Sequence, residues 1–198
     1  RARRRWRGSV GWLAAVLAVS VLPSLVPYGS AADGSARVAV VQGNVPQEEK
    51  WDPARGRDIL GRYLRLTRES VQQGARLVIW PESSTPFYFE SDIREGERIR
   101  ALVRRAGVRL LLGSDQVEPG APPKYYNAAF MVQPDGGTAA VYRKMHLVPF
   151  GEYVPLQSLL FFVGSIVESV SDFTPGEAIV PLPLDGATIS TAICYEIV

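Results

Sequence analysis

The sequence ends in Thr188-Ile-Ser-Thr-Ala-Ile-Cys-Tyr-Glu-Ile-Val198, and this stretch holds the only cysteine of the chain, Cys194. Small and β-branched residues dominate the six positions before the cysteine, which predicts a buried strand that runs into it. At the end of such a strand the sulfur lies at the sheet edge, where a following turn can direct backbone N–H groups at an oxyanion. A lone cysteine is also often a small buried hydrophobe. The nucleophile hypothesis therefore depends on partners elsewhere in the chain.

Two polar segments upstream could activate a thiol, and each is attached to an apolar run. In Leu77-Val-Ile-Trp-Pro-Glu82 a short predicted strand delivers a carboxylate at its end. In Tyr142-Arg-Lys-Met-His-Leu-Val-Pro-Phe-Gly-Glu152, Lys144 leaves a strand and Glu152 lies in the loop beyond it. A thiol needs a base or a nearby cation to act as a nucleophile at neutral pH. Glu82, Lys144 and Cys194 therefore form a candidate set of base, cation and nucleophile.

These segments resemble a known family. Three short segments resemble the three signatures of the nitrilase, or carbon–nitrogen hydrolase, superfamily, and they occur in the same order. They are Trp80-Pro-Glu82, Tyr142-Arg-Lys144 and Ile193-Cys-Tyr-Glu196. Two longer segments of the chain resemble the membrane-bound branch of this superfamily, the apolipoprotein N-acyltransferases. These segments are Val41-Gln-Gly-Asn-Val-Pro-Gln47 with Lys50-Trp51, and His146-Leu-Val-Pro-Phe-Gly-Glu-Tyr-Val-Pro155. The resemblance covers roughly residues 8–198. It implies an α/β domain built as a four-layer α-β-β-α sandwich, preceded by one transmembrane helix, in a fragment of a larger membrane protein.

The resemblance also implies a reaction, a ping-pong acyl transfer. Cys194 takes an acyl chain from a phospholipid as a thioester, and the acceptor is the N-terminal amine of a lipid-modified apolipoprotein. Glu82 takes the thiol proton, while the positive charge of Lys144 lowers the thiol pKa and stabilises the oxyanion. Neither a cofactor nor a metal is implied.

Five further residues are expected to support the site or to bind substrate. Glu152 is expected to hold or neutralise Lys144, although it could be a plain loop acid. Tyr195 and Glu196 are expected to orient Cys194 or to contact substrate. The resemblance assigns Trp51 to the site, where the residue pattern alone allows a core position, and Asn127 could line the pocket. His146 is expected to be structural, because the chemistry of the family does not use it.

The composition is that of a folded protein and argues against a nucleic-acid-binding surface. The 198 residues are 46% hydrophobic and 21% charged. Five arginines within residues 1–7 account for the net charge of +2, and the remaining chain has 17 basic and 20 acidic residues. The remaining chain is thus net negative, which argues against a nucleic-acid-binding surface, since such a surface needs a basic stripe through the folded part. A single histidine and no Cys-x-x-Cys motif make a protein metal site improbable.

The uncharged residues 8–32 follow the arginines and predict contact with a membrane. We expect a cytoplasmic basic segment over 1–8, a transmembrane helix over 9–28 and a catalytic domain over 37–198 that is truncated at its C-terminal end. The full-length protein would be a multi-pass protein of the bacterial inner membrane, with this domain on the periplasmic side. A cleaved signal peptide has a similar basic start and apolar stretch. Both alternatives leave the arginines in the cytoplasm.

Residues 37–143 alternate between strand and helix patterns, which predicts helices on one face of a mixed sheet. The expected strands cover 38–41, 77–80 and 108–112, the expected helices cover 53–73 and 93–106, and a hairpin covers 127–143. The other face of this sheet should be apolar and pack against something, for which the resemblance supplies a second sheet.

Two functional alternatives stay open beside the acyltransferase. A nitrilase-type amidase would hydrolyse a small amide with the same three residues, but it would need neither a membrane segment nor the apolar stretch 156–167. That stretch is either a helix packed on the domain or an arm that contacts lipid. A membrane-anchored binding module with a degenerate site is the second alternative. The complete set of Glu82, Lys144 and Cys194 counts against it.

Overall fold

The computed structural model describes residues 36–46, 49, 50, 52, 54–154 and 172–197, together with residues 12, 16, 17, 19 and 21, which are helical. The chain divides into two compact units, Arg1–Ser35 and Ala36–Val198. Within the part of the chain that is described, no helix is both long and apolar enough to cross a bilayer. Most of the predicted transmembrane helix over 9–28, and all of the apolar stretch 156–167, lie outside the described residues.

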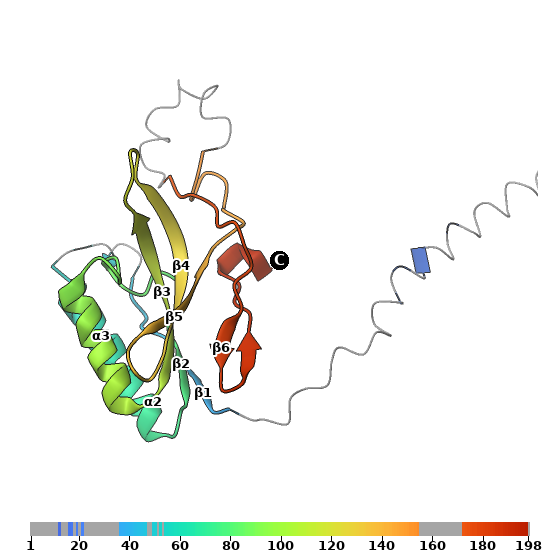
Figure 1. The fold of residues 1–198 in the computed structure, drawn as a ribbon. Helices are drawn as coiled ribbons and strands as arrows, with labels where there is room; N and C mark the ends of the chain where they lie inside the picture. Colours follow the sequence, from blue (N-terminus) through green and yellow to red (C-terminus); the bar gives the residue numbers. More distant parts are fainter. Residues whose placement is uncertain are drawn as a thin grey trace, which may run out of the picture. The chain divides into compact units, whose positions relative to one another are not determined.

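The second unit is built on a mixed five-stranded sheet (Figure 1). Its strands follow the order β1 (Val38–Val40), β2 (Leu77–Ile79), β3 (Arg109–Glu118), β4 (Lys124–Val132) and β5 (Thr138–Arg143). The first three strands are parallel, and the last three are joined as antiparallel neighbours. Parallel neighbours require crossover connections, which two helices supply.

Helices α2 (Gly56–Gln72) and α3 (Ile93–Ala106) cover one face of this sheet, as predicted (Figure 1). Asp92 starts α3 by accepting a hydrogen bond from the backbone N–H of Glu95, and Gly107 ends it in the left-handed conformation with φ 61°. The core on this side contains apolar residues of both helices and alternate residues of the strands: Ile59, Leu60, Ile99, Val103, Val78, Leu110, Leu112 and Phe130.

The opposite face of the sheet packs against a short two-stranded sheet. Strands β6 (Leu182–Leu184) and β7 (Ala187–Ile189) pair antiparallel and lie across the large sheet from the helices (Figure 1). A second core there contains Leu77, Leu111, Ala129, Met131, Leu182 and Ile193. The described residues thus supply helices, a five-stranded sheet and a small second sheet. The fourth layer of the sandwich stays a prediction.

Two strand predictions need correction. The strand expected over 188–193 is found only at residues 188 and 189, because β7 ends at Ile189 and a 3-10 helix, Cys194–Ile197, begins at the cysteine. The backbone N–H of Ile193 donates to the Glu196 carboxylate, and it is therefore not available for a hydrogen bond to a neighbouring strand. The strand expected over 108–112 continues to Glu118, because its polar half pairs with β4 along its whole length.

Candidate active site

Glu82 lies in a turn that follows β2 and packs directly on β3. Trp80 N donates to Leu111 O at 2.8 Å, and Ser84 N donates to Gly113 O at 2.8 Å. A Cβ atom at Gly113 would lie 2.7 Å from Glu82 Cα and would also clash with the carbonyl oxygen of Pro81. Glycine is therefore the residue that lets the two backbones approach this closely. The close packing fixes the position from which the Glu82 side chain starts.

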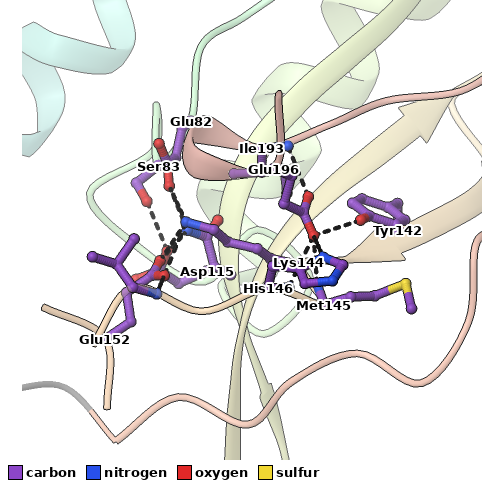
Figure 2. A network of polar contacts seen from close by, with 12 residues as sticks. Glu82, Ser83, Asp115, Tyr142, Lys144, Met145, His146, Glu152, Ile193 and Glu196 are labelled. Carbon is purple, nitrogen blue, oxygen red and sulfur yellow. Dashed lines mark hydrogen bonds and ion pairs between the residues drawn. The ribbon is translucent and has the colours of Figure 1, made fainter. Parts of the chain in front are cut away.

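Lys144 follows β5 and is 1% exposed. Its Nζ lies 2.9 Å from both carboxylate oxygens of Glu152 and 3.6 Å from Oε1 of Glu82. Figure 2 shows the two carboxylates reaching the same amine from different loops. Burial alone would lower the pKa of Lys144, but the hydrogen bond to Glu152 and the charges of Glu82, Glu152 and Cys194 raise it instead. The amine therefore stays cationic at neutral pH.

Asn127 of β4 connects the two carboxylates that surround Lys144. Its Nδ2 donates to Glu82 Oε1 at 2.5 Å and to Glu152 Oε1 at 2.9 Å, and its side chain is buried. The backbone carbonyl oxygen of Asn127 accepts a hydrogen bond from the backbone N–H of Lys144 at 2.8 Å. Glu152 also accepts a hydrogen bond from the backbone N–H of Val148 at 2.8 Å. Both carboxylates are thus oriented by donors other than the lysine.

Cys194 begins the 3-10 helix with φ 52°, a left-handed conformation that is unusual for a residue with a side chain. Its neighbour Glu196 holds the turn. The Glu196 side chain is 4% exposed and accepts four hydrogen bonds at 2.7–3.1 Å, from the Tyr142 hydroxyl and from the backbone N–H groups of Met145, His146 and Ile193. Figure 2 shows this carboxylate surrounded by its donors.

The Glu196 bonds have an electrostatic and a structural consequence. Burial would raise the pKa of Glu196, but the backbone N–H donors and the Tyr142 hydroxyl lower it, so the carboxylate is ionised at neutral pH. They also attach the turn that carries Cys194 to the end of β5, where Lys144 begins.

A pocket of about 210 Å³ is lined by both Glu82 and Cys194. Its remaining wall is formed by Ile79, Trp80, Pro81, Leu111, Gly113, Ala129, Thr191, Ala192 and Ile193. Since the charge of Cys194 also contributes to the raised pKa of Lys144, the thiol and the amine lie within electrostatic range of each other. The cavity thus has a carboxylate and an exposed thiol in its wall, and Lys144 lies outside that wall with its amine 3.6 Å from the same carboxylate. A base, a nearby cation and a thiol are the groups that nucleophilic acyl transfer requires.

Tyr195 and His146 do not line the pocket that Glu82 and Cys194 share. The side chain of Tyr195 is exposed, and it lines a larger cavity of about 770 Å³ together with Met145 and Phe173. The imidazole of His146 is exposed, and its Nδ1 lies 3.7 Å from the Glu196 carboxylate. Trp51 lies outside the described residues. Among the residues that the structure describes, no cluster of histidine, cysteine and acidic side chains could hold a metal ion.

Sequence reasoning assigned no role in the site to Ser83, Lys50 or Asp115, although Lys50 lies in one of the segments that carry the family resemblance. The Ser83 hydroxyl donates to Asp115 Oδ1 at 2.9 Å, and Lys50 Nζ donates to the carbonyl oxygen of Glu82 at 3.1 Å. Because the predicted strand ended at residue 112, the prediction did not place Asp115 on the strand beside the Glu82 turn. The available signal was Gly113, since a glycine inside a strand often marks the close approach of another backbone.

Comparison with known proteins supplies a family and a fold. The family model described as carbon–nitrogen hydrolase matches residues 37–198. An apolipoprotein N-acyltransferase of Geobacter metallireducens is 40% identical over 173 residues, which cover 86% of this chain and 33% of the relative. One from Methylococcus capsulatus is 34% identical over 198 residues, which cover 98% of this chain and 38% of the relative. The chain thus spans about a third of the length of these relatives.

Solved structures of the same kind agree with the fold. A carbon–nitrogen hydrolase of Helicobacter pylori G27 superimposes with a TM-score of 0.56 at 18% identity, covering 81% of this chain and 51% of that protein. An amidase from Nesterenkonia sp. gives a TM-score of 0.56 at 22% identity, covering 84% and 59% of the two chains. At these identities the similarity establishes a nitrilase-like α/β architecture with a mixed sheet.

Proposed function

The chain belongs to the carbon–nitrogen hydrolase family, and from this premise we propose that it carries the thioester-forming centre of an apolipoprotein N-acyltransferase. The observation that supports the chemistry most directly is the 210 Å³ pocket that Glu82 and Cys194 share, with the cation of Lys144 within electrostatic range of the thiol. The relatives that carry this activity in their names match most of the chain, which supports the choice of acyl donor and acceptor.

In the first half-reaction, the Cys194 sulfur attacks the carbonyl carbon of a phospholipid ester and Glu82 takes the thiol proton. Lys144 stabilises the negative charge on the carbonyl oxygen. The ester C–O bond then breaks, and the proton passes from Glu82 to the departing alkoxide. The products are a Cys194 thioester and a lysophospholipid.

In the second half-reaction, the amine of an N-terminal diacylglyceryl-cysteine attacks the thioester carbonyl. The C–S bond breaks, and Glu82 takes a proton from the amine and passes it to the departing thiolate of Cys194. The acceptor leaves as an amide, so atoms and charge balance without a cofactor. Deprotonation of the amine by a positioned carboxylate is ordinary general base catalysis.

The remaining residues take supporting roles in this proposal. Asn127 and Glu152 hold Lys144 and orient Glu82, and Glu196 holds the nucleophile turn. Tyr195 and Trp51 contact substrate. The domain is the periplasmic part of a multi-pass protein of the bacterial inner membrane and has the four-layer sandwich, with the transmembrane helix over 9–28 beside its phospholipid donor.

Intact-protein mass spectrometry tests the proposal. The whole protein, incubated with vesicles of phosphatidylethanolamine and phosphatidylglycerol, should gain one acyl chain at Cys194 that hydroxylamine removes. The Cys194→Ala variant is the control and should gain none. An adduct at another residue would refute the assigned nucleophile. Acylation by short amides in place of phospholipid, with water as acceptor, would instead establish the amidase alternative.

A further inference from the structure

Three consecutive hydroxyl side chains fasten the turn after Glu82 to β3. Ser83 Oγ donates to Asp115 Oδ1 at 2.9 Å, Ser84 Oγ donates to Gly113 O at 2.7 Å, and Thr85 Oγ1 bonds Ser114 Oγ at 2.6 Å. All six residues of this hydroxyl clasp, 83–85 and 113–115, lie in the protein interior, and the exposed fraction of Ser83 and of Asp115 is 8%. The proposed chemistry by itself requires none of these bonds.

The backbone of Ser83 explains why the clasp is needed. Ser83 has φ 43°, in the left-handed region where a residue with a side chain is strained. Such a conformation persists only where the surroundings hold it, and the hydroxyl bond to Asp115 does so here. Because Ser83 directly follows Glu82, its conformation sets the direction in which the chain leaves the base.

Asp115 lies among the charged groups of the centre. Burial raises the pKa of Asp115 to about 6, the Ser83 hydrogen bond and the charge of Lys50 lower it, and the charges of Glu82 and Glu152 raise it. The carboxyl group is therefore within electrostatic range of both carboxylates that flank Lys144. Its backbone is opposite Asn127 in the β3–β4 register, and Asn127 donates to those same two carboxylates.

We propose that Asp115 is a positioning residue that holds Ser83 in its left-handed conformation and so orients Glu82 toward Lys144 and Cys194. This inference rests on the proposed function, since it assigns the orientation of the base in that reaction. A hydrogen-bond acceptor is what the role requires. An amide oxygen at position 115 can accept the same bond from Ser83, whereas a methyl group cannot.

Variant kinetics test the role in the whole protein. Asp115→Ala and Ser83→Ala should each lower the rate of Cys194 acylation at saturating phospholipid by about tenfold, with KM little changed, because a misplaced base acts on the chemical step. The double variant should be no slower than either single one, because both remove the same bond. Asp115→Asn should recover the rate to within about threefold of the unmodified protein. Wild-type rates in Asp115→Ala, or an Asp115→Asn variant as slow as Asp115→Ala, would refute the inference.

Two further variants separate positioning from loss of stability. Asp135→Ala removes a carboxylate that accepts from Gly137 N in the β4–β5 turn, outside the described site, and should acylate normally. Ser83→Gly relieves the backbone strain but keeps no hydroxyl, so it should fold at least as well as Ser83→Ala and still acylate slowly. A Ser83→Gly variant with the full rate would overturn the role of the hydroxyl bond.

The proposed function and the positioning role can fail separately. If the unmodified protein forms no thioester with phospholipid, the acyltransferase proposal fails. The alkylation of Cys194 by iodoacetamide, located by peptide mass, then reports on the base without any acyl donor. Slower alkylation in Asp115→Ala than in Asp115→Asn supports the positioning role, and equal rates in the two variants and the unmodified protein refute it.

Discussion

Lys144 is the residue on which the charge balance of the site depends. Its amine is buried between Glu152 and Glu82, so its positive charge partly offsets the negative charges of these two carboxylates. A buried cation held in this way is preorganised for a developing oxyanion, and it does not need to reorient when negative charge appears. Sequence alone predicted the identities of these residues, but not that Asn127 connects the two carboxylates.

Removal of either charged partner of the thiol should therefore be severe. We expect Lys144→Met and Glu82→Gln each to lower Cys194 acylation by about 10² or more, because in the proposed mechanism each group acts in the transition state. His146→Ala should retain most of the rate, since its imidazole is exposed and 3.7 Å from Glu196. Single-turnover acylation measured by mass spectrometry checks all three. A Lys144→Met protein that acylates itself normally would contradict the role given to the amine.

The raised pKa of Asp115 predicts a pH dependence of stability. Because the folded protein holds this proton up to about pH 6 while an unfolded aspartate loses it near pH 4, ionised Asp115 destabilises the fold above pH 6. Asp115→Asn should raise the free energy of unfolding at pH 7.5 by on the order of 1–3 kcal/mol. The gain should shrink as the pH falls toward 4.

Urea denaturation of the variant and the unmodified protein at matched pH values measures this difference. The contribution of Glu196, whose pKa is lowered, changes in the opposite sense and falls away in acid. It is present in both proteins and cancels in the comparison. A gain that is constant from pH 7.5 to pH 4.5 would contradict the assignment to Asp115.

At the scale of elements, the helices and the first strands could be predicted, because apolar periodicity and glycine stops act locally. The end of α3 at Gly107 is one example. The failures have a different cause. The predicted strand stops short of Cys194, where the backbone N–H of Ile193 donates to the side chain of Glu196, three residues further along the chain. Residue preference alone does not predict such a side-chain contact. Asp115 was missed because its strand is held by pairing with β4 and not by an apolar pattern.

The approach of the Glu82 turn to β3 makes a prediction about glycine. Gly113→Ala places a methyl group 2.7 Å from Glu82 Cα, so the turn must move. We expect a loss of stability of about 1–3 kcal/mol and slower acylation. Gly61→Ala in α2 is the matched control, because its Cβ meets nothing within 4 Å and alanine favours the helix by about 0.5–1 kcal/mol. Thermal unfolding compares the two, and equal melting temperatures would contradict the close approach.

At the scale of the whole molecule, the mixed sheet with helices on one face followed from the alternation of strand and helix patterns. The second face could be predicted only as apolar. Leu182 and Ile193 cover part of it, while Val38 and Val40 of β1 are 48% and 77% exposed. The fourth layer was implied by family resemblance alone, because no residue pattern in this chain describes it.

The membrane arrangement gives a prediction for the intact protein in cells. Because five arginines precede the uncharged segment, residues 9–28 should insert with the arginines in the cytoplasm and the catalytic domain outside it. Fusions after Ser30 should give active alkaline phosphatase and non-fluorescent green fluorescent protein. Reversed signals from the two reporters would place the domain on the cytoplasmic side.

The four hydrogen bonds of Glu196 have a consequence for biosynthesis. A ribosome makes the chain from its N-terminus, so Glu82, Lys144 and Glu152 are translated well before Cys194. Until Glu196 has been added and has bonded Tyr142 and the backbone beyond β5, the cysteine has no fixed place beside the amine. The parts of the proposed site therefore come together only once the residues up to Glu196 have been made and the turn has closed.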